Sequence, residues 1–269
     1  MKLKYTGVII ALLFLVLPLS FFLVKNGQRS GRVAGVKSNS EDKKEIQGII
    51  LPHHGLARSI IQSSLERVRE EQTFSHIVIF GTNHFSPELY TFSTSEAVYN
   101  YPLAVNHIIR FTQESPEVVV NQQLLENEHS ITLILPFVKN YFPDAKVFPL
   151  IISPQHSMQD LRKKVDLLIS IMPQDTLYIA SVDFSHNKML LEALEKNKES
   201  IIAIQQFDYQ TILSFKDDHM DSSVAIATFL LSMERRGVLS WETWYNTHGA
   251  LLKDDHTLQG TSYVIGVFR

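Results

Sequence analysis

Four short segments of this 269-residue chain place histidine where an apolar, strand-like run ends. They are Leu51-Pro52-His53-His54-Gly55, Gly81-Thr82-Asn83-His84-Phe85, Glu128-His129-Ser130-Ile131 and Ser181-Val182-Asp183-Phe184-Ser185-His186. In open α/β sheets, ligands and reacting groups gather just beyond the carboxyl ends of the strands. We therefore expect the four segments to converge on one pocket.

The chemistry that these residue types favour is metal binding. Neutral imidazole and carboxylate are the usual protein ligands of iron, zinc and manganese, and two histidines with one carboxylate leave positions open for substrate and oxygen. The chain has no local HExxH motif, so the ligands would come from separate strand ends. Each histidine alone has a simpler structural explanation: His54 could lie in a turn and His129 could cap a helix. Four histidines at comparable positions favour a metal site.

The last segment offers a carboxylate as well as a histidine. Asp183 follows an apolar strand, so its carboxylate could orient an imidazole or complete a metal site. The alternative is that Asp183 caps a helix that begins near Lys188. Ser181 and Ser185 suggest a hydrolase nucleophile, but the chain contains no G-x-S-x-G motif, and we exclude that chemistry.

The arrangement of apolar segments indicates the fold that must position these residues. Strands are expected at residues 46–51, 76–81, 146–152, 176–182, 241–247 and 262–268. Helices are expected at residues 57–71, 103–112, 127–141, 157–172, 189–206 and 222–235, with Pro136 producing a kink or lying in a first turn. Strands that alternate with helices of this length predict a three-layer α/β sandwich with a mainly parallel central sheet.

The N-terminus bears on where the domain is located. Residues 7–24 are uncharged and almost wholly apolar, which is close to the length that spans a membrane. We interpret residues 1–25 as a transmembrane anchor or signal segment, with an anchor favoured because no small-residue cleavage site follows. Residues 26–44 then form a linker, and residues 45–269 form one domain, expected outside the cytoplasm. The formal net charge of −3 argues against a nucleic-acid partner.

The four histidine segments also resemble the sequence motifs of a known family. Pro52-His53-x-Gly55, Gly81-x-x-His84, Glu128-His129-Ser130-Ile131 with Leu135-Pro136-Phe137, and Ser181-x-Asp183-Phe184-Ser185-His186 are similar to the motifs of the MEMO family, also called AmmeMemoRadiSam system protein B. All four motifs occur in family order. The family's fold is similar to that of the class III extradiol dioxygenases, whose non-haem iron is held by two histidines and a carboxylate. The resemblance implies this fold and one divalent metal, with Fe(II) favoured and Zn or Mn as alternatives.

Residue by residue, the resemblance implies that His53 and His84 are metal ligands. It places His186 as a general base, His129 as a histidine facing the oxygen site, and Asp183 as a further catalytic residue of the MEMO pattern. Three departures stand out. Asp221 occupies the position of a cysteine common in the family, Phe85 replaces a second histidine, and His54 replaces a small residue.

Asp221 is the departure that matters most, because a carboxylate there would complete a set of two histidines and one carboxylate. Two alternatives stay open for this position. The neighbouring His219 could serve as the ligand instead, or Asp221 could simply cap the helix expected at residues 222–235.

The leading functional interpretation is a membrane-tethered, MEMO-like metal-binding domain with the redox chemistry of non-haem iron. One alternative is a zinc-type hydrolase. Another is a non-catalytic binding or scaffold protein on a vestigial dioxygenase-like fold. The family association also implies AMMECR-type and radical-SAM proteins as partners.

Overall fold

Short apolar segments form the strands of a single sheet in the computed structural model, which describes residues 44–86 and 92–269. The strands are β1 (Gly48–Leu51), β2 (His76–Thr82), β3 (Phe92–Thr94), β4 (Val119–Val120), β5 (Lys146–Ile152), β6 (Thr176–Ser181), β7 (Trp241–His248) and β8 (Ser262–Phe268). Their order across the sheet is β4-β3-β5-β2-β6-β1-β8-β7.

The centre of the sheet is parallel and its flanks are not. Strands β5, β2, β6 and β1 are neighbours that all run in the same direction. On one side β8 pairs antiparallel with β1 and β7 pairs antiparallel with β8, while on the other side β3 pairs antiparallel with β5. The predicted α/β class is confirmed, but the sheet is mixed, with parallel pairing confined mainly to the strands buried on both faces.

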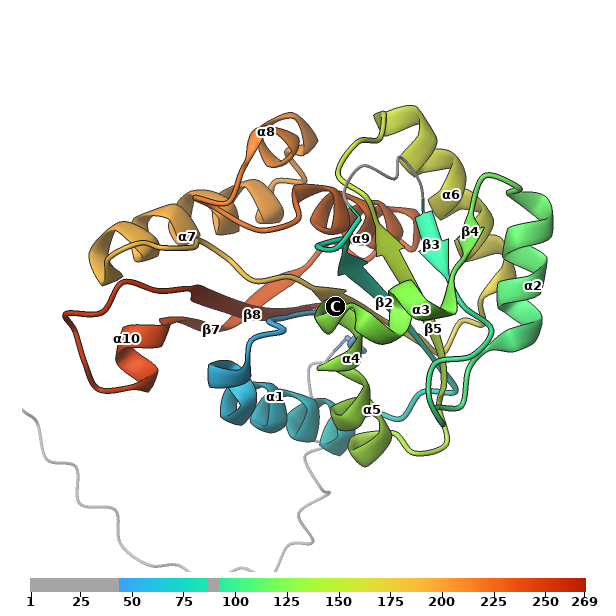
Figure 1. Ribbon diagram of the computed structural model, residues 1–269, viewed down its shortest axis with the longest axis horizontal. Coiled ribbons are helices and arrows are strands. Elements are labelled where there is room, and N and C mark those ends of the chain that lie inside the picture. Colours follow the sequence, from blue (N-terminus) through green and yellow to red (C-terminus); the bar gives the residue numbers. More distant parts are fainter. Residues whose placement is uncertain (1–43, 87–91) are drawn as a thin grey trace, which may run out of the picture. The chain divides into compact units, whose positions relative to one another are not determined.

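Helices cover both faces of this sheet (Figure 1). They are α1 (Arg58–Glu71), α2 (Val105–Glu114), α3 (Gln122–Asn127), α4 (His129–Thr132), α5 (Leu135–Tyr141), α6 (Met158–Ile171), α7 (Leu190–Gln205), α8 (Tyr209–Ser214), α9 (Ser223–Arg235) and α10 (Gly249–Leu252), with a short 3-10 helix η1 (Gly55–Ala57). Helices α1 and α5 pack on one face, and α2, α6 and α9 pack on the other.

Successive strand residues point to these two faces in turn. In β1, Ile49 and Leu51 join the core under α1 and α5, whereas Ile50 joins the core under α6 and α9. All three side chains are fully buried. This two-sided burial explains why the central strands read as continuous apolar runs in the sequence.

One predicted helix is divided in two. The segment 127–141 forms α4 and α5, with a break at Leu133 and Ile134, and Pro136 lies in the first turn of α5. Proline is tolerated there because the first helical N–H groups have no partner within the helix. The predicted first-turn position of Pro136 is confirmed, and the prediction of a single continuous helix is wrong.

The prediction of a membrane-anchored, extracytoplasmic domain is also corrected. Across residues 44–86 and 92–269, no helix is long and apolar enough to cross a membrane. The anchor or signal segment at residues 1–25, and most of the linker at residues 26–44, lie outside the described residues.

Candidate metal centre

The carboxyl ends of three central strands meet at one edge of the sheet. Leu51 of β1 and Gly81 of β2 both pair in register with Ser181, the last residue of β6. Three of the predicted site residues each lie two residues beyond the end of one of these strands: His53, His84 and Asp183. Parallel pairing therefore brings together side chains that are far apart in the sequence, as the strand-end argument requires.

Asp221 reaches the same place by a different route. Phe184, just beyond β6, and Met220 form an isolated antiparallel bridge. The N–H of Asp221 donates to the Asp183 carbonyl at 3.0 Å, and the N–H of Asp183 donates to Asp221 Oδ2 at 3.3 Å. Ser222, not Asp221, caps helix α9 through its hydroxyl. The helix-cap alternative for Asp221 is therefore excluded.

Two imidazoles face the same oxygen of Asp221. His53 Nε2 lies 2.9 Å from Asp221 Oδ2, and His84 Nε2 lies 3.5 Å from that atom. Two ligands bound to one ion at about 2.1 Å are separated by roughly 3.0 to 3.4 Å, depending on the angle between them. The observed separations are therefore those of atoms that could share one cation.

The environment of His53 Nε2 also favours a cation shared with Asp221. His53 is 2% exposed, and its Nε2 makes no hydrogen bond within the described residues despite its closeness to Asp221. A buried polar atom without a hydrogen bond is costly, so such an atom in a native site calls for a partner. A cation held between the nitrogen and the carboxylate would satisfy both groups.

His84 is oriented by a carboxylate that the sequence analysis assigned no role. Glu128 is fully buried, its Oε1 lies 2.7 Å from His84 Nδ1, and its Oε2 accepts the His84 N–H at 2.8 Å. With the Nδ1 proton directed to Glu128, the Nε2 lone pair of a neutral His84 faces Asp221. Such histidine–carboxylate pairs are the usual support of metal-binding histidines. The signal in the sequence was an acidic residue directly before His129 in the Glu128-His129-Ser130-Ile131 motif.

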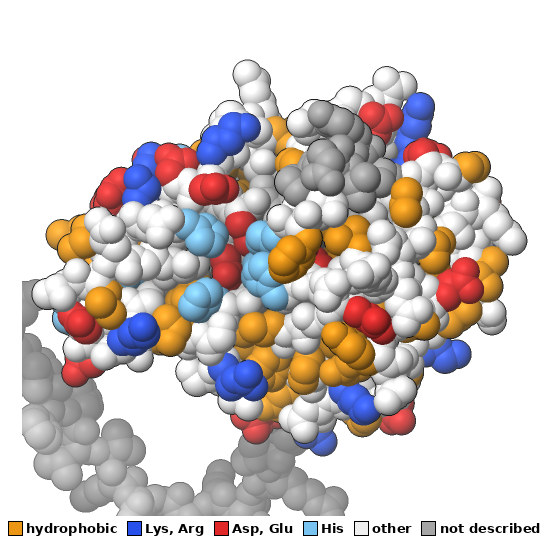
Figure 2. Space-filling view, viewed as in Figure 1, with side chains coloured by type: hydrophobic (Ala, Val, Ile, Leu, Met, Phe, Trp, Pro, Cys, Tyr) orange, Lys and Arg blue, Asp and Glu red, His pale blue; other side chains and the backbone are white. Residues whose placement is uncertain are grey.

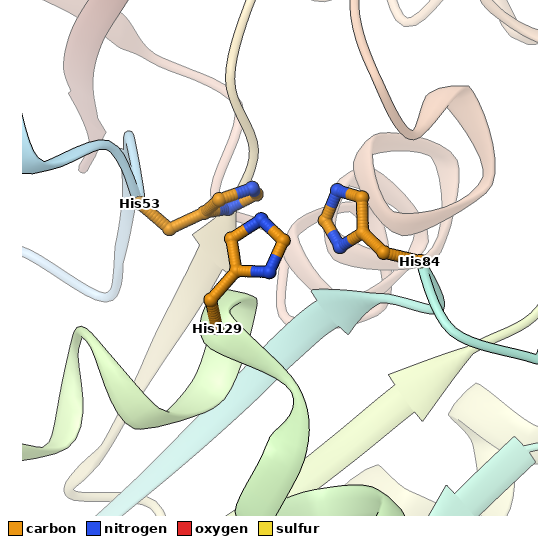
Figure 3. A group of neighbouring side chains, drawn as sticks. All are labelled: His53, His84 and His129. Atoms are coloured by element: carbon orange, nitrogen blue, oxygen red, sulfur yellow. The ribbon is translucent and has the colours of Figure 1, made fainter.

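His129 completes a group of three imidazoles (Figure 3). It is the first residue of α4, and its ring stacks on His84 at a centroid distance of 4.1 Å and meets the edge of His53 at 5.1 Å. Ring nitrogens of the three histidines lie within 4.8 Å of one another, and the His129 side chain is about half exposed. Glu128, not His129, caps α4. His129 thus lies at the open side of the cluster.

The sixth predicted residue, His186, lines a cavity that adjoins this cluster. The cavity has a volume of about 500 Å³, and its walls include His84, Asp221, Asp217 and the apolar side chain of Ile152. The His186 N–H donates to the Asp217 carbonyl at 2.9 Å, which fixes the segment beside the cavity. On the face shown in Figure 2, histidine side chains surround acidic side chains in a hollow.

His219, the alternative to Asp221, is engaged elsewhere. Its ring stacks on Phe215 at 4.0 Å, with Nε2 2.7 Å from Glu199 and Nδ1 3.0 Å from Asp218. These contacts use both ring nitrogens. Of the two neighbouring candidates, the fold brings Asp221 to the cluster and leaves His219 outside it.

The histidines and carboxylates of the cluster shift one another's pKa values. Burial alone lowers the pKa of His84, but the hydrogen bonds and charges of Asp221 and Glu128 outweigh it and raise the pKa to about 10. Burial opposes the charge on Asp221, yet His53 and His84 hold the pKa of that carboxyl below its usual range. The pKa of His129 is lowered by burial and by the charges of His84 and His53. A cation could replace the protons that the two carboxylate-facing histidines otherwise hold.

The fold and the site define a mixed α/β protein with histidines and carboxylates clustered at the carboxyl edge of its sheet. A family profile described as Memo-like protein matches residues 31–256, and the chain belongs to this family. The resemblance inferred from the four motifs is thus confirmed.

Individual relatives agree with this assignment. A MEMO1 family protein of Aquifex aeolicus is 30% identical over 160 residues, which cover 56% of this chain and 42% of the relative. One of Methanopyrus kandleri is 22% identical over 241 residues, covering 83% of each chain. The chain thus spans less than half of the Aquifex relative. A crystal structure of an uncharacterized protein from Escherichia coli K12 shares the fold, with a TM-score of 0.53, 12% identity, and coverage of 82% of this chain and 99% of that one.

Proposed function

We propose that this domain binds one divalent cation through His53 Nε2, His84 Nε2 and Asp221 Oδ2, and that this cation is Fe(II). The observation that carries the proposal is the approach of two imidazole nitrogens to one carboxylate oxygen, at 2.9 and 3.5 Å. Two histidines and a carboxylate are a donor set typical of non-haem Fe(II), and the same set also accepts Mn(II) or Zn(II).

A bound Fe(II) would supply redox chemistry toward dioxygen and Lewis acidity toward a substrate oxygen. The protein's residues would do the rest. Asp183 accepts the His53 N–H at 2.9 Å and so fixes the position of that histidine. His186 lines the adjoining cavity, where it could accept a proton from a bound substrate. His129, at the open side of the cluster, would face a small ligand that enters from solvent.

The first test is metal analysis of protein purified without chelators. We expect about one ion per chain in the wild type and a loss of most of that metal in His53→Ala, His84→Ala and Asp221→Ala. His107→Ala is the matched control, because His107 lies on α2 with its ring against His76. Metal below about a tenth of an ion per chain, with no response of the melting temperature to added metal, would contradict the proposal. Anomalous scattering from a crystal would identify the ion and its ligands.

A zinc-type hydrolase is the second candidate, and one observation favours it. His129 brings a third imidazole into reach of His53 and His84, and three histidines are a common catalytic zinc site. Iron in the purified protein together with substrate-dependent oxygen uptake would support the first candidate. Zinc alone, with hydrolysis that is independent of oxygen, would support the second.

We also propose AMMECR-type and radical-SAM proteins as partners, on the family association alone. The double variant His53→Ala/His84→Ala separates scaffold from enzyme. If binding of such a partner survives in metal-free double variant protein, the metal is not needed for assembly. If partner binding is lost together with the metal, the metal-loaded cluster is required for assembly of the complex.

A further inference from the structure

The hydroxyl of Ser181 lies between a backbone carbonyl and the ring of His53. Its Oγ is 2.5 Å from the carbonyl oxygen of Ser130 and 3.2 Å from His53 Nδ1. Ser181 is the last residue of β6, and its side chain is fully buried. No water needs to be invoked for either contact, since the two distances are those of direct hydrogen bonds.

The positions of the protons follow from what each group can donate. A carbonyl oxygen only accepts, so the short contact to Ser130 requires the Ser181 proton. A serine hydroxyl has one proton, and its oxygen can then only accept from His53. In neutral His53 the single ring N–H hydrogen must therefore be on Nδ1. The opposite arrangement would leave two oxygens 2.5 Å apart with no proton between them, which is repulsive.

The local fold keeps the Ser130 carbonyl available for this contact. Helix α4 ends at Thr132, and the N–H of Ile134 bonds to the Ile131 carbonyl, so the Ser130 carbonyl is left to Ser181. The Ser130 hydroxyl donates to the carbonyl of Thr82 at 2.9 Å, which ties α4 to the end of β2. The break in the predicted helix thus exposes the acceptor that directs the Ser181 proton.

We propose that Ser181 is a positioning residue, which holds the proton of His53 on Nδ1 and so turns the Nε2 lone pair toward Asp221. The inference rests on the proposed metal site. The two histidines are then supported in the same way, because the Nδ1 of each faces a hydrogen-bond acceptor. The acceptor is Ser181 for His53 and Glu128 for His84. Ser181 itself would not touch the metal.

The test is zinc affinity measured by competition with a chelator. Ser181→Ala should weaken zinc binding by about 10- to 100-fold, the usual effect of removing such a support. The matched control is Ser185→Ala, since Ser185 is also fully buried but bonds to Ser262 Oγ at 2.8 Å. That variant should bind zinc as the wild type does. Ser181→Thr keeps the hydroxyl and should restore most of the affinity.

A second measurement does not depend on any variant. In ¹⁵N-labelled wild type loaded with zinc, His53 should carry a slowly exchanging proton on Nδ1 and none on Nε2. A proton on Nε2, or equal zinc affinity in Ser181→Ala and Ser185→Ala, would overturn this inference while leaving the metal site intact. If the wild type takes up no zinc, manganese or iron, the proposed function itself fails.

Discussion

Glu128 and His84 are joined by two contacts from one buried carboxylate. One oxygen of Glu128 lies 2.7 Å from His84 Nδ1, and the other accepts the His84 N–H at 2.8 Å. The same carboxylate accepts the N–H of Ser130 at 3.2 Å, so it also caps α4. One side chain therefore sets the ring orientation of His84 and anchors the helix that carries His129.

This double role predicts the effect of Glu128→Gln. The amide has one carbonyl oxygen and cannot accept all three N–H groups, so His84 should lose its fixed orientation. We expect zinc affinity to fall by about 10- to 100-fold, measured by chelator competition. Glu126→Gln is the control, because Glu126 is a nearby carboxylate that bonds to Gln122 and Tyr99 rather than to the cluster. Equal affinities of the two variants would show that Glu128 only caps the helix.

The sequence predicted which strand ends would carry the residues of the candidate site, because the relevant signals are local. The apolar runs that mark these strand ends stop at Pro52, Gly81 and Asp183, and the ends of three adjacent parallel strands converge by geometry. His53, His84 and Asp183 were found in this way, each two residues past its strand. The α/β class followed from the same alternation of strands and helices.

The remaining features depend on contacts between distant segments. Asp221 reaches the cluster through the bridge between Phe184 and Met220, so the sequence alone could not choose between Asp221 and His219. The antiparallel flanks of the sheet arise from where β8 and β3 pair, which periodicity does not encode. The break between α4 and α5 is marked in the sequence only by Pro136, and the sequence alone could not decide between a kink and the first turn of a new helix there.

The stability of the metal-free protein should depend on pH. The pKa of His84 is raised from 6.5 to about 10, and that of His53 is raised as well, chiefly because carboxylate contacts outweigh burial. A raised pKa in the folded state contributes stability that is complete below about pH 6.5 and is lost as the pH rises toward 10. The melting temperature in the presence of a chelator should therefore fall over this window.

Two comparisons isolate the cause of that pH dependence. His84→Asn removes the titrating group, so the decline of melting temperature with pH should be shallower in that variant. Zinc should also flatten the decline, because a bound cation takes the place of the protons and its binding strengthens as they are released. A metal-free wild type whose melting temperature rises from pH 7 to 9 would contradict the assignment.

Asp221 should determine which metal the site prefers. Asp221→Cys introduces a thiolate, the ligand that the motif resemblance implies at this position, and thiolate favours zinc over manganese or Fe(II). We expect the ratio of zinc to manganese affinity to rise by at least about tenfold, measured by competition between the two ions. Asp221→Asn, which keeps the shape but not the charge, should weaken both ions. An unchanged ratio in Asp221→Cys would mean that this side chain does not bind the metal.

Gly81 should be essential for the approach of α4 to the end of β2. A Cβ at this position would lie 2.6 Å from Ser130 Oγ and 2.8 Å from Ile131 Cδ1, closer than such atoms can approach. Gly81→Ala must therefore displace the buried side chains of Ser130 and Ile131 on α4, which should cost about 1 to 3 kcal/mol of unfolding free energy in a packed core. Because α4 carries Ser130 and His129, zinc affinity should fall as well. Urea denaturation and chelator competition measure the two effects.

Gly55→Ala is the matched control for Gly81→Ala. A Cβ at Gly55 meets no atom within 4 Å, although Gly55 lies only two residues from His53. Stability and zinc affinity should both stay close to those of the wild type in this variant. If Gly81→Ala loses stability but binds zinc as tightly as Gly55→Ala, then α4 supports the fold without setting the geometry of the metal centre. A loss of both properties in Gly81→Ala alone would tie the position of that helix to the site.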